Sequence, residues 1–242
     1  IGFLQQHYRN RTGHPSEPIL RAHGNIRCVD AMLTWDGAPG VVTGYRDGAP
    51  VQLWPNPRPT AWPEAEFVVG NPPFIGGKDV RSRLDPGYAE ALWIAHPRMN
   101  ESADLVMYWW NQAAEILTRP GTVLRRFGFV TTNSITQVFQ RRTVERWLSG
   151  PQALSLIYAA PDHPWTKASR DSAAVRIAMT VAQAGRHDGT VLTRLSESAL
   201  ETDEPVVELA ASSGRINADL TIGVDVTLSL IHISEPTRRT PI

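Results

Sequence analysis

The sequence of 242 residues has a single cysteine, no net charge and no long apolar run. One cysteine, Cys28, excludes a disulfide within the chain and favours a reducing compartment, so we expect a cytoplasmic protein. No stretch approaches the roughly 18 apolar residues of a membrane span, and no signal peptide is recognisable. Lys plus Arg and Asp plus Glu both total 24. Overall charge therefore does not indicate a nucleic-acid partner, although a local basic face remains compatible with one.

Both ends of the sequence suggest a truncated reading frame. The chain starts at Ile1 without an initiator methionine. Residues Leu228 to Arg238, LSLIHISEPTR, match the translation of a transposase sequencing adapter along their whole length. We therefore expect residues 228–242 to be a non-native tail and leave them out of the fold prediction.

Apolar runs and turn signals alternate in the way that is typical of an α/β protein. Strands are predicted at Glu66–Gly70, Phe127–Thr132, Leu154–Ala160 and Ala173–Val181, and helices at Asp104–Leu117, with Asp104 as N-cap, and Thr143–Leu148. In the last strand, Val175, Ile177, Met179 and Val181 are expected to share one face. Strand, helix and strand in alternation favour a doubly wound sheet.

Domain boundaries are predicted from shifts in composition. Residues 35–65 are rich in proline and glycine and predict a loop or short hairpin, and the segment from Ile75 to Tyr88 predicts a further loop. After Gly185 the chain turns acidic, which predicts a loose segment and a domain edge. We expect one domain over residues 1–195 and a linker leading into a second region over 196–227.

Two polar residues are predicted to follow strands of this sheet. Asp30 ends a short apolar segment, Ile26–Asp30, in which Cys28 is expected to be buried, and Asn71 follows the predicted strand at Glu66–Gly70. Ligands of open α/β sheets bind beyond the carboxyl ends of the strands. Both residues are therefore candidate ligand contacts, although Asp30 alone is also compatible with a helix N-cap.

The segment Asn71-Pro72-Pro73-Phe74 suits the activation of an aromatic amine. Such a nitrogen is a poor nucleophile because its lone pair is delocalised into the ring. Two fixed acceptors opposite its N–H bonds, the Asn71 side-chain oxygen and the Pro72 carbonyl, free that lone pair. Consecutive prolines hold the carbonyl rigidly, and Phe74 offers a face for a planar base, a contact that contributes roughly 1–3 kcal/mol. A rigid turn with a buried Phe is the plain alternative.

These residues resemble the amino-methylating DNA methyltransferases, and among them the large single-chain, type IIG-like restriction–modification enzymes that modify adenine. The resemblance covers roughly residues 20–227 and includes GNIRCVDAML, NPPFIGGKDVR, DLVMYWWNQAAEIL, RFGFVTTNSITQ and PDHPWTKA followed by AAVRIAMTV. It implies a Rossmann-like class I sheet, S-adenosylmethionine as cofactor and double-stranded DNA as partner. It also implies that residues 1–195 are a catalytic domain and that 196–227 begin a target-recognition region.

Roles for particular residues follow from the resemblance. Catalysis falls to Asn71, Pro72, Pro73 and Phe74, cofactor contacts to Asp30 and Asn71, and contacts with the target base or DNA to Phe74, Lys78, Trp165, Arg141 and Arg142. Lys78, Arg141 and Arg142 are equally compatible with an ordinary solvated surface. Trp109 and Trp110 are predicted to be helix core. No His or Cys spacing indicates a metal site.

One departure from the family pattern concerns the glycine-rich loop and acidic ribose contact expected before Asp30, which residues 1–24 lack. We therefore predict that this chain is inactive alone and that its parent enzyme is active. Cytosine-amino DNA, RNA and protein-glutamine methyltransferases share the motif, and a catalytically dead DNA-binding module is a further alternative.

Overall fold

The computed structural model describes residues 26–37, 42–46, 49–165, 175–198 and 206–223. Two compact units, residues 1–30 and 31–242, are treated separately below. In the first unit, residues 26–30 form neither helix nor strand, and Cys28, Ile26 and Val29 are exposed. The predicted buried strand at Ile26–Asp30 is therefore wrong, because its few apolar side chains are not packed. Residues 1–24, predicted to lack a glycine-rich loop, and the predicted tail at 228–242 lie outside the described residues.

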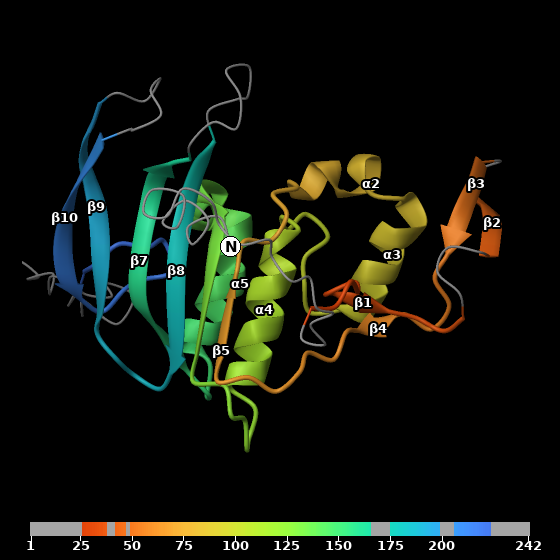
Figure 1. Cartoon of the computed structure of the whole chain (residues 1–242), viewed down its shortest axis with the longest axis horizontal. Coiled ribbons are helices and arrows are strands. Elements are labelled where there is room, and N and C mark those ends of the chain that lie inside the picture. Colours follow the sequence, from red (N-terminus) through yellow and green to blue (C-terminus); the bar gives the residue numbers. More distant parts are fainter. Residues whose placement is uncertain (1–25, 38–41, 47–48, 166–174, 199–205, 224–242) are drawn as a thin grey trace, which may run out of the picture. The chain divides into compact units, whose positions relative to one another are not determined.

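The second unit contains a six-stranded mixed sheet with the strand order β10-β9-β7-β8-β6-β5 (Figure 1). Its strands are β5 Phe67–Gly70, β6 Arg126–Thr132, β7 Leu154–Pro164, β8 Arg176–Ala184, β9 Gly189–Ser198 and β10 Val206–Gly214. Strands β5 and β6 are parallel, and β8 is antiparallel to both of its neighbours, β6 and β7. The carboxyl ends of β5, β6 and β7 therefore meet at one edge of the sheet.

The α/β class is confirmed, and the sheet is mixed. Strand β5, an apolar run in the sequence, is only partly buried, since Phe67 and Val69 are 53% and 85% exposed. The segment after Gly185 is not loose, because β9 pairs with β7 and β10 pairs with β9, and the predicted boundary at residues 195/196 falls inside β9.

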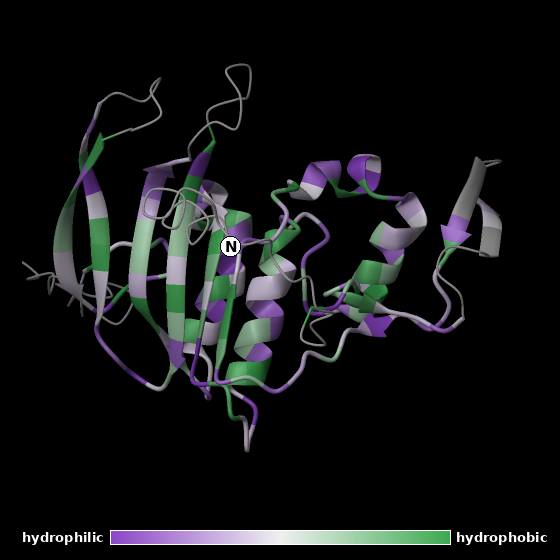
Figure 2. Cartoon of the chain, viewed as in Figure 1, coloured by the Kyte–Doolittle hydropathy of each residue, from purple (hydrophilic) through white to green (hydrophobic). Residues whose placement is uncertain are grey.

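Helices α4, Val106–Leu117, and α5, Val138–Ser149, pack against strands of the sheet. Trp110 of α4 is fully buried, meets the ring of Phe127 at 5.2 Å and donates to the Thr180 hydroxyl at 3.4 Å. Apolar positions accordingly recur along α4 and the central strands in Figure 2. Residues buried on that face of β7, Leu154 and Leu156, share a core with Val144 of α5. Both helices thus cover the same face, so the doubly wound arrangement is not seen in the described part of the chain.

Ile177, Met179 and Val181 share one face of β8 as predicted, but the helices pack against the opposite face, where Ala178, Thr180 and Ala182 are buried. On the predicted face Ile177 is buried, whereas Met179 and Val181 are half-buried. Small side chains allow α4 to approach the strand closely enough for Trp110 to reach Thr180. Helix α5 is longer than the predicted Thr143–Leu148, and α4 begins after Asp104, whose side chain does not cap it.

The remaining short elements lie before and after β5 in the sequence. Before β5 come the pair β1 Leu33–Thr34 with β4 Arg58–Pro59 and the hairpin β2 Val42–Arg46 with β3 Ala49–Leu53. After β5 come the turn η1 Gly77–Asp79, the short helix α2 Val80–Arg83 and helix α3 Pro86–Ala95. The hairpin predicted within residues 35–65 is confirmed. Trp54 meets Trp35 at 4.4 Å and Tyr88 at 5.3 Å, which joins the Pro-rich segment to α3.

Helix α3 begins inside a segment for which a loop is predicted. Asp85 caps it by accepting the Tyr88 N–H at 3.1 Å, and Pro86 occupies the first helical position. Asp followed by Pro is a helix-start signal that the sequence analysis did not use.

Candidate active site

Asn71 to Phe74 follow the carboxyl end of β5 and form neither helix nor strand. Gly70 at the end of β5 pairs with Phe129 of β6, so the motif starts beside the second half of a parallel strand. Asn71 and Pro73 are exposed, Pro72 is buried and Phe74 is half-buried. The predicted position of the motif, at a strand end and with Asn71 accessible, therefore agrees with the structure.

The loop that follows the motif is fixed to the segment before α4. The Leu105 N–H donates to the Ile75 carbonyl at 2.8 Å, and the Gly77 N–H donates to Asp104 Oδ1 at 3.0 Å. A Cβ at Gly77 would lie 2.1 Å from the Ser102 carbonyl oxygen. Only glycine allows this approach without a shift of the backbone, which gives a physical reason for the second glycine of the sequence IGG.

Asp104 joins three parts of the chain at this loop. Besides the Gly77 N–H, its carboxylate accepts Gln140 Nε2 at 3.0 Å, the Ser134 hydroxyl at 2.5 Å and the Thr132 hydroxyl at 3.4 Å. The Asp104 N–H donates in turn to Gln140 Oε1 at 2.9 Å. The predicted role of Asp104 as a helix cap is therefore wrong, because its oxygens bind partners that are far away in the sequence.

The structure brings together the two aromatic residues that were predicted to contact a base. The rings of Phe74 and Trp165 lie 6.3 Å apart, centroid to centroid, at an interplanar angle of 74°. The Trp165 residue is 40% exposed, and its backbone N–H donates to the Val175 carbonyl at 3.0 Å. Two segments that are distant in the sequence thus form a partly exposed aromatic wall at the last residue of the Asn71–Phe74 motif.

A pocket of about 360 Å³ opens at the same strand end. It is lined by Ala31, Trp62, Val68, Val69, Gly70, Asn71, Pro72, Pro73, Trp109 and Phe129. None of these residues is charged. Trp62 is held by a hydrogen bond from its Nε1 to the Ala31 carbonyl at 2.6 Å. An uncharged pocket with two indoles suits a planar heterocycle.

Trp62 and Trp109 are pocket residues that the sequence analysis missed. Trp110 is core as predicted, whereas Trp109 is half-buried and faces the pocket. Helical spacing in the sequence does not show which of the two tryptophans is buried in the core, because both lie beside apolar positions. Asp30, the predicted cofactor contact, is half-buried and belongs to the first compact unit, where it ends no strand.

The basic residues predicted to contact DNA differ in their exposure and in their partners. Lys78 lies exposed on η1, directly after the loop held by Asp104, and Arg142 lies exposed with its guanidinium 5.6 Å from the Phe139 ring centre. Arg141 instead pairs with Glu145 at 2.8 Å. It lines a separate and larger pocket of about 710 Å³ that contains no residue of the Asn71–Phe74 motif. Lys78 and Arg142 are thus the more available cations.

Among the residues that the structure describes, no three His, Cys, Asp or Glu side chains are placed to hold a metal ion together. No helix in the same part of the chain is long and apolar enough to cross a membrane.

These features define an α/β protein with an aromatic, accessible site at the carboxyl edge of its sheet. A family model described as the DNA-methyltransferase domain of MmeI matches residues 5–193. The chain belongs to this family.

Solved structures with a likeness to the chain include two restriction–modification proteins. One is the type IIL restriction-modification enzyme MmeI in complex with DNA, with 27% identity, a TM-score of 0.49, and coverage of 66% of this chain and 20% of that one. Another is a modification subunit assigned to a type I restriction enzyme from Vibrio vulnificus YJ016, with 15% identity, a TM-score of 0.38, and coverage of 54% and 25%. The chain thus spans about a fifth of the length of MmeI. No curated protein matches it.

Proposed function

We propose that this chain is the methyl-transferring part of a restriction–modification DNA methyltransferase that modifies the exocyclic amino group of adenine. The observation that carries the proposal is the placement of Asn71-Pro72-Pro73-Phe74 at the end of β5, with Trp165 facing Phe74. Membership of the MmeI methyltransferase family supports the reaction class. The choice of adenine rests on the motif and on the resemblance described above.

S-adenosylmethionine, when bound, supplies an electrophilic methyl group on a sulfonium. The uncharged pocket between Trp62 and Trp109 fits the adenine ring of that cofactor, and its volume lies in the usual range of about 300–1,000 Å³. Asn71 lines this pocket and belongs to the same short motif as Phe74, which supports its proposed contacts with both cofactor and target. Asp30 remains a proposed cofactor contact on the strength of the resemblance.

The target adenine is flipped out of the duplex at a cost of a few kcal/mol and stacks on Phe74, with Trp165 at its edge. The Asn71 side-chain oxygen and the Pro72 carbonyl accept the two amino hydrogens, which localises the nitrogen lone pair. The nitrogen then forms a bond to the methyl carbon while the carbon–sulfur bond breaks and sulfur keeps the electron pair. The surplus proton leaves the nitrogen for solvent afterwards. Lys78 and Arg142 are proposed phosphate contacts, and Arg141 is a weaker candidate because Glu145 neutralises it.

A transfer assay with identified products tests this proposal. The protein encoded by the gene that carries this chain is incubated with unmethylated duplex DNA and radiolabelled S-adenosylmethionine, and the DNA is digested to nucleosides. We expect label in N6-methyladenine, loss of label in Asn71→Ala, and retention in Asn56→Ala, a matched change at an exposed turn residue bonded to Asp36. Label in N4-methylcytosine would correct the target base. Label that survives in Asn71→Ala would refute the role of Asn71.

A further inference from the structure

Strand β7 carries an irregularity just before Trp165. Its register with β8 shifts between Ala160 and His163, so Pro161 and Asp162 form a bulge. Asp162 has a φ of 53°, a left-handed conformation that Asp tolerates better than most residues. Bulges bend a strand and change the direction of the side chains that follow. The bulge therefore determines where the end of β7, and with it Trp165, is directed.

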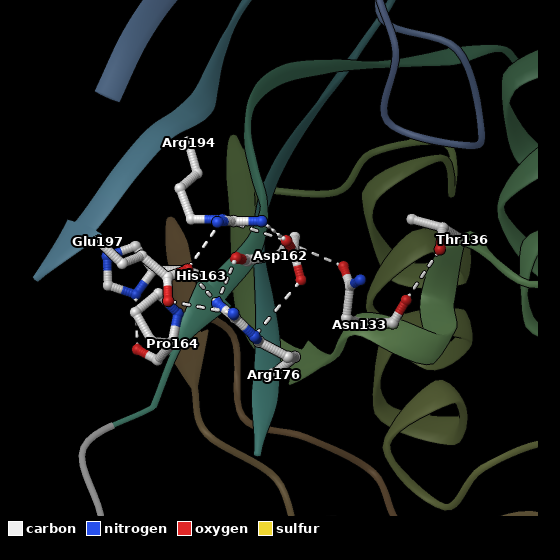
Figure 3. Close-up of polar contacts among 8 residues, drawn as sticks. All are labelled: Asn133, Thr136, Asp162, His163, Pro164, Arg176, Arg194 and Glu197. Carbon is white, nitrogen blue, oxygen red and sulfur yellow. Dashed lines mark hydrogen bonds and ion pairs between the residues drawn. The ribbon is translucent and has the colours of Figure 1, made fainter. Parts of the chain in front are cut away.

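Asn133 holds this bend from the end of β6, the strand on the other side of β8. It is the first residue after β6, and its side-chain oxygen accepts the Asp162 N–H at 2.9 Å (Figure 3). A bulge leaves its extra residue without a ladder partner, so this side-chain acceptor replaces the missing backbone bond.

Two arginines hold the other side of Asp162. Arg194 Nη2 donates to the Asp162 carboxylate at 2.7 Å, and Arg176 Nε lies 3.7 Å from its other oxygen. Glu197, with a side chain only 8% exposed, binds Arg194 Nε at 2.8 Å and is chelated by both Nη atoms of Arg176. Hydrogen bonding from Arg176 lowers the pKa of Glu197. Two cations and two anions balance, so these arginines are structural partners of the bend rather than free cations for phosphate.

The residues on either side of Asn133 are hydrogen-bonded to Asp104, which also holds the loop after Phe74. Thr132 and Ser134 both donate to Asp104, and the same carboxylate holds the Gly77 N–H in the loop after Phe74. One short turn, Thr132–Ser134, is therefore bonded on one side to the loop that carries Phe74. On its other side it is bonded to the bend that precedes Trp165.

We propose that Asn133 is a positioning residue that sets the separation of Phe74 and Trp165, and that the turn Thr132–Ser134 is the bridge through which it acts. Asn133 touches neither ring and takes no part in the chemistry. It fixes the bend at Asp162, which directs Trp165 toward Phe74. The benefit for base binding rests on the function proposed above, whereas the geometric role does not.

Fluorine NMR of 5-fluorotryptophan-labelled protein tests the geometric role. The chain has eight tryptophans, and a Trp165→Phe variant assigns the Trp165 resonance. In Asn133→Leu, which keeps the shape but removes the acceptor, we expect the Trp165 resonance to shift or broaden while the other resonances stay unchanged. Asn133→Asp, which keeps an acceptor oxygen, is expected to restore it, and Asn217→Leu is the matched control.

An unchanged Trp165 resonance in Asn133→Leu would overturn the proposal, and so would equal shifts of all resonances in a folded protein. If Asn133→Leu does not fold, Asn133→Ala decides, because it removes the side-chain acceptor of the Asp162 N–H without adding bulk. Selective broadening of Trp165 would then support the proposal, and no change would refute it.

A kinetic measurement tests the link to function. In the methylation assay, Asn133→Leu is expected to lower kcat by about 10- to 100-fold, as misplacement of a stacking wall does. It should leave the KM for S-adenosylmethionine unchanged, because Asn133 does not line the pocket at Trp62. A raised cofactor KM with normal kcat would contradict the proposal. Absence of methylation in the wild type would refute the proposed function alone, and the NMR result would still decide the positioning role.

Discussion

Replacement of Asp104 by alanine offers a direct test of the hydrogen-bond network behind the site. The carboxylate accepts four donors from three separate segments, at 3.0, 3.0, 2.5 and 3.4 Å. A hydrogen bond to a charged acceptor contributes about 1.5–3 kcal/mol. Asp104 is only half-buried and the Thr132 contact is long, so water replaces part of what is lost. We therefore expect Asp104→Ala to lower the free energy of unfolding by about 2–4 kcal/mol.

Urea unfolding followed by tryptophan fluorescence measures this change as a shift in midpoint at constant slope. Asp104→Asn should cost only about 1 kcal/mol, because the amide oxygen still accepts and the Ser134 hydroxyl can accept from the amide nitrogen. Asp219→Ala is the matched control, since Asp219 accepts only from Thr221 within a local turn. A loss for Asp104→Ala below about 0.5 kcal/mol, no larger than an ordinary surface change, would refute the network's importance.

Three further predictions concern the loop, the ion pairs and the pocket. Gly77→Ala should destabilise the chain by about 1–3 kcal/mol in urea, because its Cβ would lie 2.1 Å from the Ser102 oxygen, whereas Gly76→Ala, with its nearest atoms at 3.8 Å, should be tolerated. The pKa of Glu197 lies below its ordinary value of 4.5, so its contribution to stability is present above that pH and is lost as pH falls through the lowered pKa. Glu197→Gln should therefore flatten the acid limb of the unfolding midpoint against pH, and an unaltered limb would contradict this. In the full-length protein that carries this chain, Trp62→Ala should weaken S-adenosylmethionine binding roughly tenfold, as measured by calorimetry. An equal loss of affinity in Trp35→Ala, which lies outside the pocket, would argue against a specific contact.

Local sequence pattern predicted much of the fold. Apolar runs identified β5, β6 and most of β7, and the motif at Asn71 was placed at a strand end because two prolines cannot continue a strand. Strands β9 and β10 were missed because most of their residues are exposed or half-buried, which leaves no strong alternation. Glu197 lies in a segment that was predicted to be acidic and loose, yet arginines of β8 and β9 bind it.

Features that depend on contacts across the fold could not be predicted. Asp104 stands where a helix cap would stand, and only the tertiary structure brings Ser134 and Gln140 to its carboxylate. The bulge at Asp162 likewise has no local signal, since its acceptor, Asn133, lies in the turn after β6, 29 residues away. The aromatic pair was predicted as two separate base contacts, and their proximity follows from the parallel directions of β5, β6 and β7.

Base-modification sequencing tests the central claim most directly. DNA is taken from cells that express the full-length gene carrying this chain, beside cells that express its Asn71→Ala or Asn56→Ala variant. The account predicts modified adenine at one short sequence motif in the wild type and in Asn56→Ala, and none in Asn71→Ala. Modification that persists in Asn71→Ala, or unmodified DNA despite well-expressed and folded wild-type protein, would contradict it.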